Sequence, residues 1–476
     1  MPPSVFIFKE CFMSLQLAII IGYLLLTVAV GALAVRRGGK NAAAFHGAGL
    51  GIFMCVAAGT GEWLGGTSTT GVAEYSYMFG LSGAWYTIAN ALGIVFLAVL
   101  FARLYRSLDV ITVPAILGKF AGRTAQSVAS FLLIFVMVAV GTAQVVGAGA
   151  LGAAVLGLDF TVSVIVLGIG FIVYTLRGGM LAVGYTNVLH LVAMYGGILL
   201  AVVVVCSEMG GLSGILASLP EKHSSMFGIG KGTVFSWLIA SILGACTAQA
   251  GIQPLLAAKD ETTARTSAFI TAVLVAPFGV LVAVLGMAAK VRFPELANAK
   301  MALPALMMSL HPAVGGAVLA AIMAAILSTI SPLILASGTM FTMDLYKSHI
   351  NPQASNEKLL QVSKIATGIS GIACVAMALL FAQGTRILDM VYFAYTQRGA
   401  LFVVLLLSIY WKGSTGKGAV MSMLLTAFVG FAWISWKAAF GAYPLHPAFS
   451  ETFAAVLCAA ITMPICSLLT KSGSAR

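Results

Sequence analysis

Charged side chains are scarce in this chain of 476 residues, since Asp, Glu, Lys and Arg together make up only 8% of it. Hydrophobic residues account for 60%, and a soluble fold has too little interior to bury so much apolar surface. Apolar stretches of about 20 residues, the length that crosses a bilayer as a helix, recur along the whole chain. We therefore predict an all-α polytopic membrane protein of the cytoplasmic (inner) membrane, with the lipid bilayer as its surroundings.

Cysteine and histidine are also few, with 7 and 6 residues. The cysteines lie almost entirely within apolar stretches and lack the spacing of metal ligands, which is typical of small buried side chains. The histidines form no cluster, and no nucleophile with a spaced base is evident, so we expect no enzyme activity and no organic cofactor. The net charge of +12 is spread over alternate short loops, which indicates membrane topology and not a nucleic-acid partner. No obligatory protein partner is indicated.

Hydrophobic runs predict thirteen transmembrane helices. Their ranges are 15–35, 50–72, 79–104, 126–156, 159–178, 185–207, 233–258, 265–290, 313–343, 359–383, 387–412, 416–438 and 448–470. The excess of Lys and Arg in alternate loops places the N-terminus outside the cell and the C-terminus in the cytoplasm. Two connecting segments, 107–124 and 294–312, are interpreted either as short amphipathic helices or as plain connectors.

The segment AAGTGEWLGGTSTTG, residues 57–71, combines five glycines with one acidic side chain. Glycine weakens a helix, and unwound backbone at membrane depth is tolerated where it lines a wet cavity or is buried in protein. The freed carbonyl oxygens suit a hard cation. Glu62 is the only acidic residue that the predicted spans place well inside the bilayer, where a carboxylate needs a partner, a cavity or an ion pathway. Close packing explains the glycines but not Glu62, so the segment predicts a transport site.

A second interruption, GACTAQAGIQP at 244–254, lies five predicted helices farther along the chain. Corresponding broken helices in two halves of opposite orientation mark the binding site of transporters built from inverted repeats. In the ninth span, Ser328 and Thr329 are adjacent hydroxyls about 100° apart on a helix, among small alanines that permit close approach. These hydroxyls either reach one ion between helices or bond back to their own preceding turn.

Three motifs resemble the sodium/solute symporter family, which includes proline, sialic acid, pantothenate and sugar symporters. They are LSTISPLILASGTMFTMDLYK in the ninth span, YTLRGGMLAVGYTNVLH at 174–190 and AAKDETTAR at 257–265. The resemblance runs over nearly the full length and implies a leucine-transporter-like fold in a single transporter domain, residues 1–476. Its implied parts are a leading helix at 15–35, a five-plus-five inverted repeat at 50–207 and 233–412, and two trailing helices at 416–470.

The resemblance also implies a Na⁺ site between the first and eighth core helices. The implied ligands are the carbonyl oxygens of Thr60, Trp63 and Ala325 and the hydroxyls of Ser328 and Thr329. Glu62 falls where the proline symporters carry an aspartate that is important for Na⁺, which gives it an implied role in ion coupling. The expected function is the Na⁺-coupled import of a small organic solute by alternating access.

Arg398 lies near the centre of the eleventh predicted span, where a permanent positive charge needs a partner. That partner is either Glu62 or an anionic substrate group held in a bidentate fork, and the second alternative favours an organic acid or a zwitterion as the solute. Other candidates for the substrate site are equally explicable as interhelical contacts. They are Trp63, Gly65, Trp85, Gln144, Gln249 and Gln253.

Two rival functions stay open. One is proton coupling through Glu62, with His190 as a weaker candidate; the family usually has Gln at this position and Asp where Asn187 stands. Pro254 also departs from the family, which often has arginine there, and these departures leave the choice of Na⁺ or H⁺ open. The other rival is a transporter-like solute sensor, although the tail after about residue 470 is too short for a cytoplasmic signalling domain.

Overall fold

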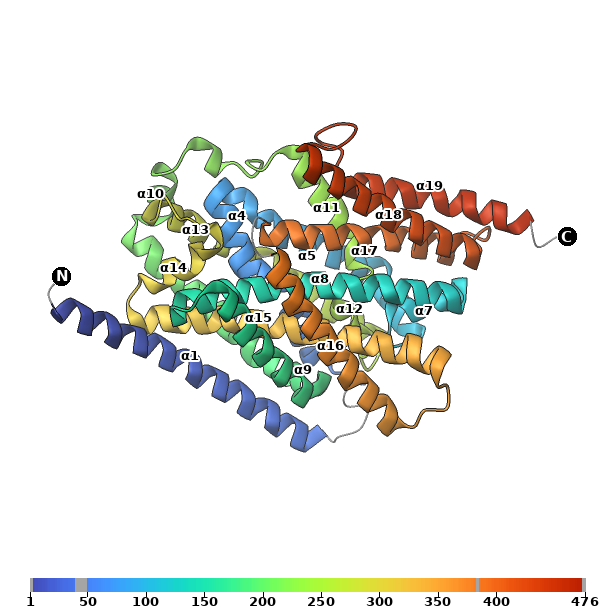
Figure 1. The fold of residues 1–476 in the computed structure, drawn as a ribbon, viewed down its shortest axis with the longest axis horizontal. Coiled ribbons are helices and arrows are strands. Elements are labelled where there is room, and N and C mark those ends of the chain that lie inside the picture. Colours follow the sequence, from blue (N-terminus) through green and yellow to red (C-terminus); the bar gives the residue numbers. More distant parts are fainter. Residues whose placement is uncertain (1–2, 39–48, 382–384, 473–476) are drawn as a thin grey trace.

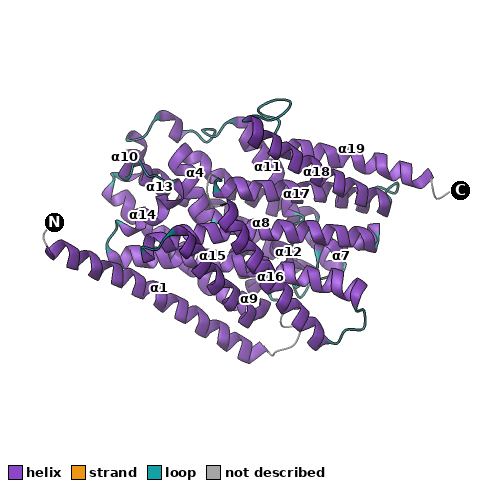
Figure 2. Cartoon of the chain, viewed as in Figure 1, coloured by secondary structure: helices purple, strands orange, loops and turns teal. Residues whose placement is uncertain are grey.

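The computed structural model of the chain describes residues 3–38, 49–381 and 385–472 (Figure 1). These residues are almost entirely helical, and their only extended pairing is an isolated bridge between Leu50 and Ala258 (Figure 2). In chain order the helices are α1 (Pro3–Gly38), α3 (Ile52–Trp63), the π-helix η1 (Thr67–Gly71), α4 (Val72–Phe79), the 3₁₀-helix η2 (Gly80–Ala84), α5 (Trp85–Leu100), α6 (Ala102–Ser107), α7 (Val113–Ala121), α8 (Arg123–Leu156), α9 (Phe160–Glu208), α10 (Gly211–Ala217), the 3₁₀-helix η3 (Glu221–Ser224), α11 (Lys231–Ala245), α12 (Gln249–Leu256), α13 (Glu261–Arg292), the 3₁₀-helix η4 (Ala299–Met301), α14 (Ala302–Met308), α15 (Pro312–Met340), the π-helix η5 (Phe341–Ile350), α16 (Asn356–Phe381), α17 (Ile387–Tyr410), α18 (Gly416–Phe440) and α19 (Glu451–Ser472).

The described chain contains 12 helical spans that are long and apolar enough to cross a membrane. The predicted span 50–72 is not among them, because the glycine-rich segment divides it. Its first half, α3, has only 12 residues. The chain is not helical at 64–66 and then resumes as η1 and α4. The interruption that the glycines predict is therefore confirmed.

Two further breaks also lie where the sequence indicates them. Residues 246–248 separate α11 from α12, within the predicted interruption at 244–254. In α9, Gly179 has a φ of +63°, a left-handed conformation that favours glycine. This kink divides α9 into the two predicted spans, and each of the two connecting segments contains a short helix, α7 and α14.

Besides Glu62, which the sequence places well inside the bilayer, further acidic residues lie on helical spans. Glu74 lies on α4 and Asp344 on η5, because both helical spans extend beyond the predicted boundaries. Each of these carboxylates is buried and hydrogen-bonded. Glu74 accepts the backbone N–H of Ile387 at 3.0 Å. Asp344 accepts hydroxyl and amide protons from Thr112, Gln126 and Ser130 at 2.8 to 3.0 Å.

Helix α15 forms the centre of the bundle and packs against α3, α8 and α9. It is buried on all sides, as expected for a helix that is apolar and small around its whole circumference. The α1 helix lies at the rim beside α9 and α15, and α18 and α19 form an antiparallel pair against α17 (Figure 1). The broken helix α3 is thus in the interior, in contact with the central helix.

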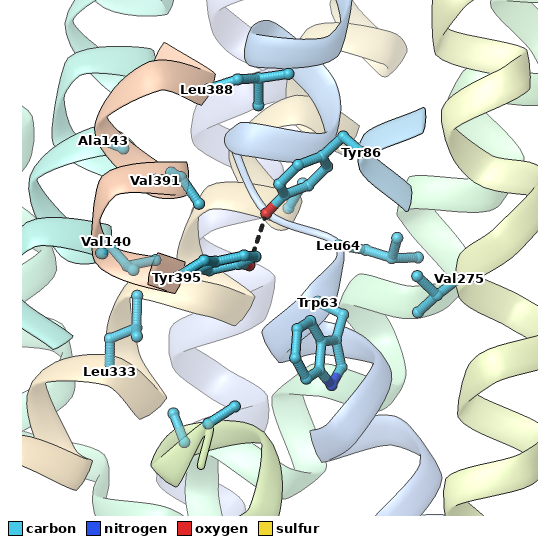
Figure 3. Packing of buried hydrophobic residues seen from close by; sticks show 14 of the residues in the cluster. Trp63, Leu64, Tyr86, Val140, Ala143, Val275, Leu333, Leu388, Val391 and Tyr395 are labelled. Carbon is cyan, nitrogen blue, oxygen red and sulfur yellow. Dashed lines mark hydrogen bonds between the residues drawn. The ribbon is translucent and has the colours of Figure 1, made fainter. Parts of the chain in front are cut away.

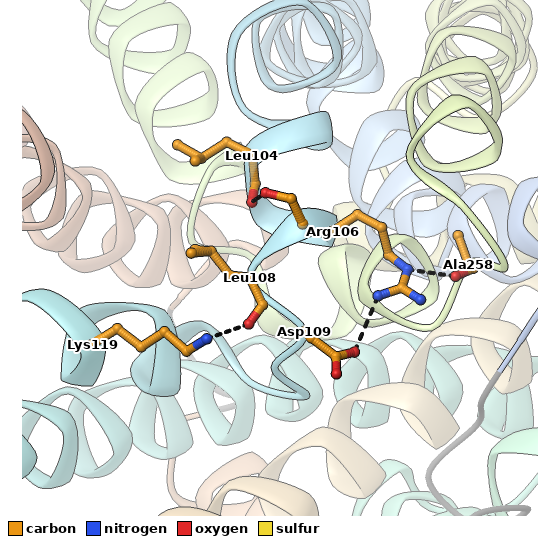
Figure 4. A network of polar contacts seen from close by, with 7 residues as sticks. Leu104, Arg106, Leu108, Asp109, Lys119 and Ala258 are labelled. Carbon is orange, nitrogen blue, oxygen red and sulfur yellow. Dashed lines mark hydrogen bonds and ion pairs between the residues drawn. The ribbon is translucent and has the colours of Figure 1, made fainter.

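The two broken helices are joined at the end of the molecule where α3 begins and α12 ends. The Leu50 backbone donates to Ala257 at 2.8 Å and accepts from Lys259 at 2.9 Å. Arg106 adds a 2.6 Å bond from its Nε to the Ala258 carbonyl, and it pairs with Asp109 at 3.3 Å (Figure 4). The two broken helices can therefore move apart at this end only if these backbone hydrogen bonds break.

Candidate cation and solute site

The break after α3 faces two hydroxyls of the central helix α15. The Thr329 hydroxyl donates to the Gly61 carbonyl at 2.7 Å and lies 3.3 Å from the Glu62 carbonyl. The Ser328 hydroxyl lies 3.0 Å from the same Gly61 carbonyl and 2.8 Å from Ala325 in its own preceding turn. Ser328 thus bonds back to its own helix, as one sequence-based interpretation expects, and also across to the break, while its binding of an ion stays a prediction.

The hydroxyls meet carbonyls one residue away from those that the family resemblance implies. The Thr60 carbonyl accepts the Leu64 backbone N–H at 3.0 Å, and the hydroxyls contact Gly61 and Glu62. The proposed ligation by Thr60 and Trp63 stays a prediction. Neutral oxygens beside one carboxylate are a donor set that fits a hard monovalent cation.

Two glycines are required by the close approach of these helices. A Cβ at Gly65 would lie 2.4 Å from the Thr329 hydroxyl oxygen and 2.6 Å from the Gln144 side-chain oxygen. A Cβ at Gly61 would lie 2.5 Å from the side-chain nitrogen of Asn187. Any larger residue would push α15 or its neighbours away from the broken backbone, so the glycines are needed for packing as well as for unwinding.

Gln144, a predicted substrate ligand, binds the broken backbone itself. Its Oε1 accepts the Gly66 backbone N–H at 2.6 Å, and its Nε2 lies 3.5 Å from the Thr67 hydroxyl. Gly66 directly precedes η1, so this side chain satisfies a donor that the break leaves without a helical partner. Gln144 therefore stabilises the interruption from α8.

Glu62 and Arg398 are both buried, with exposed fractions of 7% and 1%. Their charges are close enough to interact, yet no ion pair within 4.0 Å joins them in the described chain. Oε2 of Glu62 and Nε and Nη2 of Arg398 are buried without a hydrogen-bond partner. The guanidinium carbon lies 3.8 Å from the centre of the Tyr395 ring and 5.7 Å from that of Trp63. Two opposite charges thus border the site, and each has unsatisfied atoms.

Aromatic side chains of α3, α5 and α17 form a cover beside Arg398. The Tyr86 hydroxyl lies 3.1 Å from that of Tyr395 and 2.8 Å from that of Thr67, and Trp63 lies beyond this pair (Figure 3). The sequence reasoning missed Tyr86 and Tyr395. A usable signal existed for Tyr395, because it lies one helical turn before Arg398 and therefore on the same face.

Two predicted substrate residues are engaged elsewhere. Trp85 donates its indole N–H to the Met226 carbonyl at 2.8 Å, in the segment that precedes α11. Gln249 accepts the Val113 backbone N–H at 2.7 Å and thereby holds the start of α7. Gln253 is buried on α12, whose Gly251 lies against the Trp63 indole. Gln249 and Gln253 thus both lie on α12, and the contact of this helix with Trp63 is made at Gly251, between them.

The residues that depart from the family pattern occupy different places. The Asn187 side chain reaches the Ser328 carbonyl at 3.5 Å and thus borders the cation site. His190 turns the other way, and its Nδ1 hydrogen-bonds the hydroxyl of Tyr23 on α1. His190 is therefore a contact between α9 and α1 in this structure.

Comparison with known proteins decides the family. The sequence profile of the Sodium:solute symporter family matches residues 45–426. The chain belongs to this family. Among curated relatives of this symporter, the high-affinity proline transporter PutP of Bacillus subtilis is 27% identical over 415 residues, which cover 81% of this chain and 85% of the relative. The sodium/proline symporter of Escherichia coli is 27% identical, and the match covers 90% of this chain and 88% of the relative. The sodium/glucose cotransporter of Vibrio parahaemolyticus is 26% identical, and the match covers 74% of this chain and 72% of the relative.

Solved structures confirm the fold of this symporter. A substrate-bound, outward-open Na⁺-coupled sialic acid symporter superposes with a TM-score of 0.80 at 20% identity, covering 96% of this chain and 98% of that chain. The nucleobase-cation symporter Mhp1, in a closed conformation with bromovinylhydantoin, gives a TM-score of 0.59 at 13% identity. The predicted leucine-transporter-like fold class is confirmed. The family match and the 12 apolar spans of the described chain support a multi-pass protein of the cell membrane.

Proposed function

We propose that this symporter couples Na⁺ to the import of a small organic solute that carries a carboxylate, as an organic acid or a zwitterion. Residues 50–207 and 233–412 form the two inverted repeats, with a leading helix before them and two trailing helices after them. The N-terminus lies outside and the C-terminus in the cytoplasm, since Lys and Arg are concentrated in the loops that this orientation makes cytoplasmic.

The observation that carries Na⁺ coupling is the convergence of Ser328 and Thr329 on the Gly61 carbonyl, at 3.0 and 2.7 Å. With the ion bound, the two hydroxyls would keep their protons but turn them away from Gly61, and the ion would lie between oxygens of α3 and oxygens of α15. Because the ligands come from a broken and an intact helix, the bound ion would fix the position of the break. This supplies a physical link between ion binding and the opening of the site.

The solute site lies beside the ion, between Glu62 and Arg398. The unpaired Nε and Nη2 of Arg398 form one edge of the guanidinium, which is the edge that binds a carboxylate in two parallel hydrogen bonds. Stacking on Tyr395 holds the guanidinium plane in place. A buried arginine with an open edge is costly unless a ligand completes it, so the solute supplies the missing carboxylate.

One observation favours proton coupling as the second candidate. The buried Oε2 of Glu62 has no hydrogen-bond partner, so a proton there would cost no existing contact. In that case Glu62 would carry the coupling proton, and the Ser328 hydroxyl bond would remain in place during transport. The two candidates differ in which ion gradient drives uptake.

A thermal-unfolding screen of the purified protein identifies the solute class. Amino acids, carboxylates, sugars and nucleobases are tested with and without Na⁺, because a ligand stabilises the folded state by RT ln(1 + [L]/Kd). We expect carboxylate-bearing solutes to raise the midpoint temperature of unfolding. The rise should be larger in a Na⁺ salt than in the corresponding choline salt. Stabilisation by sugars alone would contradict the assignment of Arg398, while leaving Na⁺ coupling intact.

A further inference from the structure

A polar chamber of about 540 Å³ lies away from the central site, where α17 begins and α18 ends. It is bordered by charged side chains of both signs, Asp389 of α17, Glu451 of α19 and Lys437 of α18. Trp237 and Tyr392, whose rings stack at 4.3 Å, separate it from the aromatic cover of the central site. The volume falls in the range of about 300–1,000 Å³ that small-molecule sites occupy.

An apolar chamber of about 360 Å³ adjoins the polar one, between α8, α16, α17 and α18. Three residues line both chambers, namely Thr385, Asp389 and Ile434. The remaining walls of the apolar chamber are almost wholly hydrophobic. They are Phe135, Ala139, Thr142, Met377, Phe381, Met390, Phe393 and Phe431. One ligand that has a polar end and an apolar end can therefore occupy both spaces.

One wall of the polar chamber is a chain of hydrogen bonds. Lys437 donates to the Tyr443 hydroxyl at 3.1 Å, and this hydroxyl donates to Glu451 at 2.5 Å. Burial, followed by the negative charge of Glu451, raises the pKa of Tyr443, so the phenol keeps its proton. An ammonium has three donors and a carboxylate about four acceptor positions, so Lys437 and Glu451 each retain capacity for a ligand.

The facing wall carries Asp389, whose negative charge lies close enough to contribute to the raised pKa of Tyr443. Asp389 accepts the Tyr75 hydroxyl and lies 3.8 Å from Nε of Arg386. Its side chain remains 48% exposed, so its carboxylate also has room for a further donor. The chamber therefore offers acceptors from two walls and an ammonium donor from one of them, which suits a head group with both charges.

The two chambers lie at the level where a membrane interface is expected. Phe381 and Phe431 at the mouth of the apolar chamber are 49% and 42% exposed. Farther along α18, toward its end, the side chains of Trp436 and Phe440 are 47% and 68% exposed. Tryptophan gathers at the boundary between hydrocarbon and head groups, whereas phenylalanine is apolar and suits the hydrocarbon. Trp436 therefore marks the interface, with the phenylalanine-lined apolar chamber on the hydrocarbon side and the polar chamber among the head groups.

We propose that the two chambers bind one phospholipid whose head group carries a primary ammonium, as in phosphatidylethanolamine. An acyl chain fills the apolar chamber, the phosphate meets Lys437, and the ammonium donates to Asp389 and Glu451. A choline head group has no N–H to donate, and a glycerol head group donates only from neutral hydroxyls, so neither offers the two carboxylates a charged donor. The lipid would hold α18 and α19 against α17.

The test measures lipid binding to the purified full-length protein by native mass spectrometry and thermal unfolding. Dioleoyl forms of phosphatidylethanolamine, phosphatidylcholine and phosphatidylglycerol keep the chains constant. We expect phosphatidylethanolamine to bind at least tenfold more tightly than the other two. Soluble O-phosphoethanolamine is the arm that separates a lipid from a free head group, and we expect it to bind far more weakly.

Variants locate the binding in the chambers. Lys437→Gln and Glu451→Gln should remove the preference for phosphatidylethanolamine. The controls Lys290→Gln, at a half-buried lysine over a tyrosine ring, and Glu208→Gln, at an exposed ion-paired glutamate, should keep it. Ala139→Leu fills part of the apolar chamber and should weaken the binding of all three lipids. Phe431→Ala removes a ring from the wall of the same chamber and is a second test of it. Equal binding of the three lipids, an unchanged preference in Lys437→Gln and Glu451→Gln, or equally tight binding of O-phosphoethanolamine would overturn the proposal.

Discussion

The Thr329 hydroxyl and the Gly61 carbonyl are joined by a 2.7 Å hydrogen bond that connects the central helix α15 to the last turn of α3. This bond occupies oxygens that a cation between the two helices would use. The end of α3 is therefore positioned by whatever the Thr329 hydroxyl binds. Ion binding and the geometry of the break are consequently parts of one equilibrium.

Gly65→Ala should damage the cation site without replacing a ligand side chain. The added methyl would lie 2.4 Å from the Thr329 hydroxyl oxygen, and such overpacking costs about 1–3 kcal/mol. We expect a lower unfolding midpoint and a smaller stabilisation by Na⁺. Gly170→Ala on α9 is the control, since a Cβ there meets nothing within 4 Å. Similar behaviour of the two variants would show that the close approach of Gly65 is unimportant.

Glu62→Gln separates the two coupling ions. If Glu62 is a fixed charge near Na⁺, the neutral amide should weaken Na⁺ binding because one negative charge is lost from a buried site. If Glu62 carries a proton, the variant should bind solute but lose uptake driven by a pH gradient without Na⁺. Uptake into proteoliposomes under each gradient alone distinguishes these results, and we expect the Na⁺ gradient to be sufficient in the wild type.

Arg398→Lys tests the proposed carboxylate site. The variant keeps the charge but loses the planar edge that includes Nε and Nη2, so we expect normal folding and at least a tenfold loss of solute affinity. The loss corresponds to about 1.4 kcal/mol. Affinity is measured by calorimetry with the solute that the thermal screen identifies. Wild-type affinity in Arg398→Lys would reject the clamp.

A double-variant cycle tests whether Arg398 instead serves Glu62. Removing one partner of a buried pair strands the other charge at a cost of about 3–5 kcal/mol, so a structural pair should show strong coupling. We expect little recovery of stability when Glu62→Gln is combined with Arg398→Gln, because no ion pair joins them here. Substantial rescue of the unfolding midpoint would assign the arginine to Glu62.

Arg106→Gln tests the contact that joins the broken helices at their far end. It removes the 2.6 Å bond to the Ala258 carbonyl. Cys55 is buried beside the same junction, 3.7 Å from the Leu50 carbonyl and 3.3 Å from the Pro254 carbonyl, so it should become more accessible. We expect several-fold faster labelling of Cys55 by a small thiol reagent, with the other cysteines replaced by Ala. Exposed Arg123→Gln is the matched control. Equal labelling rates would mean that Arg106 does not restrain this end.

The sequence predicted the breaks, because glycine clusters leave a local signal, whereas the meeting of α3 with Ser328 and Thr329 was implied by the family resemblance. It did not predict that Gly61 and Glu62 present the contacting carbonyls. Regular helical periodicity ends at a break, so the direction of each carbonyl depends on dihedral angles that composition does not encode. The position of Glu74 was missed for a related reason, since polar residues that are hydrogen-bonded by another helix lower the apparent hydropathy of a span.

Trp85 and Gln249 show a second limit of sequence reasoning. Both residue types are common in solute sites, and both lie on helices that border one. The partners that hold them, Met226 and Val113, are backbone groups of connecting segments whose paths only the structure reveals. Aromatic and amide side chains are equally useful as contacts between helices and loops, so residue type alone did not separate the two roles.

The central claim is that Na⁺ binds where Ser328 and Thr329 face the end of α3. Equilibrium binding of radiolabelled Na⁺ to the purified protein tests it without knowledge of the solute. We predict saturable binding by the wild type and by Ser337→Ala, a control on α15 whose hydroxyl bonds only to its own helix at 3.1 Å. The double variant Ser328→Ala, Thr329→Ala should bind at least tenfold more weakly, a change of about 1.4 kcal/mol. Undiminished Na⁺ binding by a folded double variant would contradict the account.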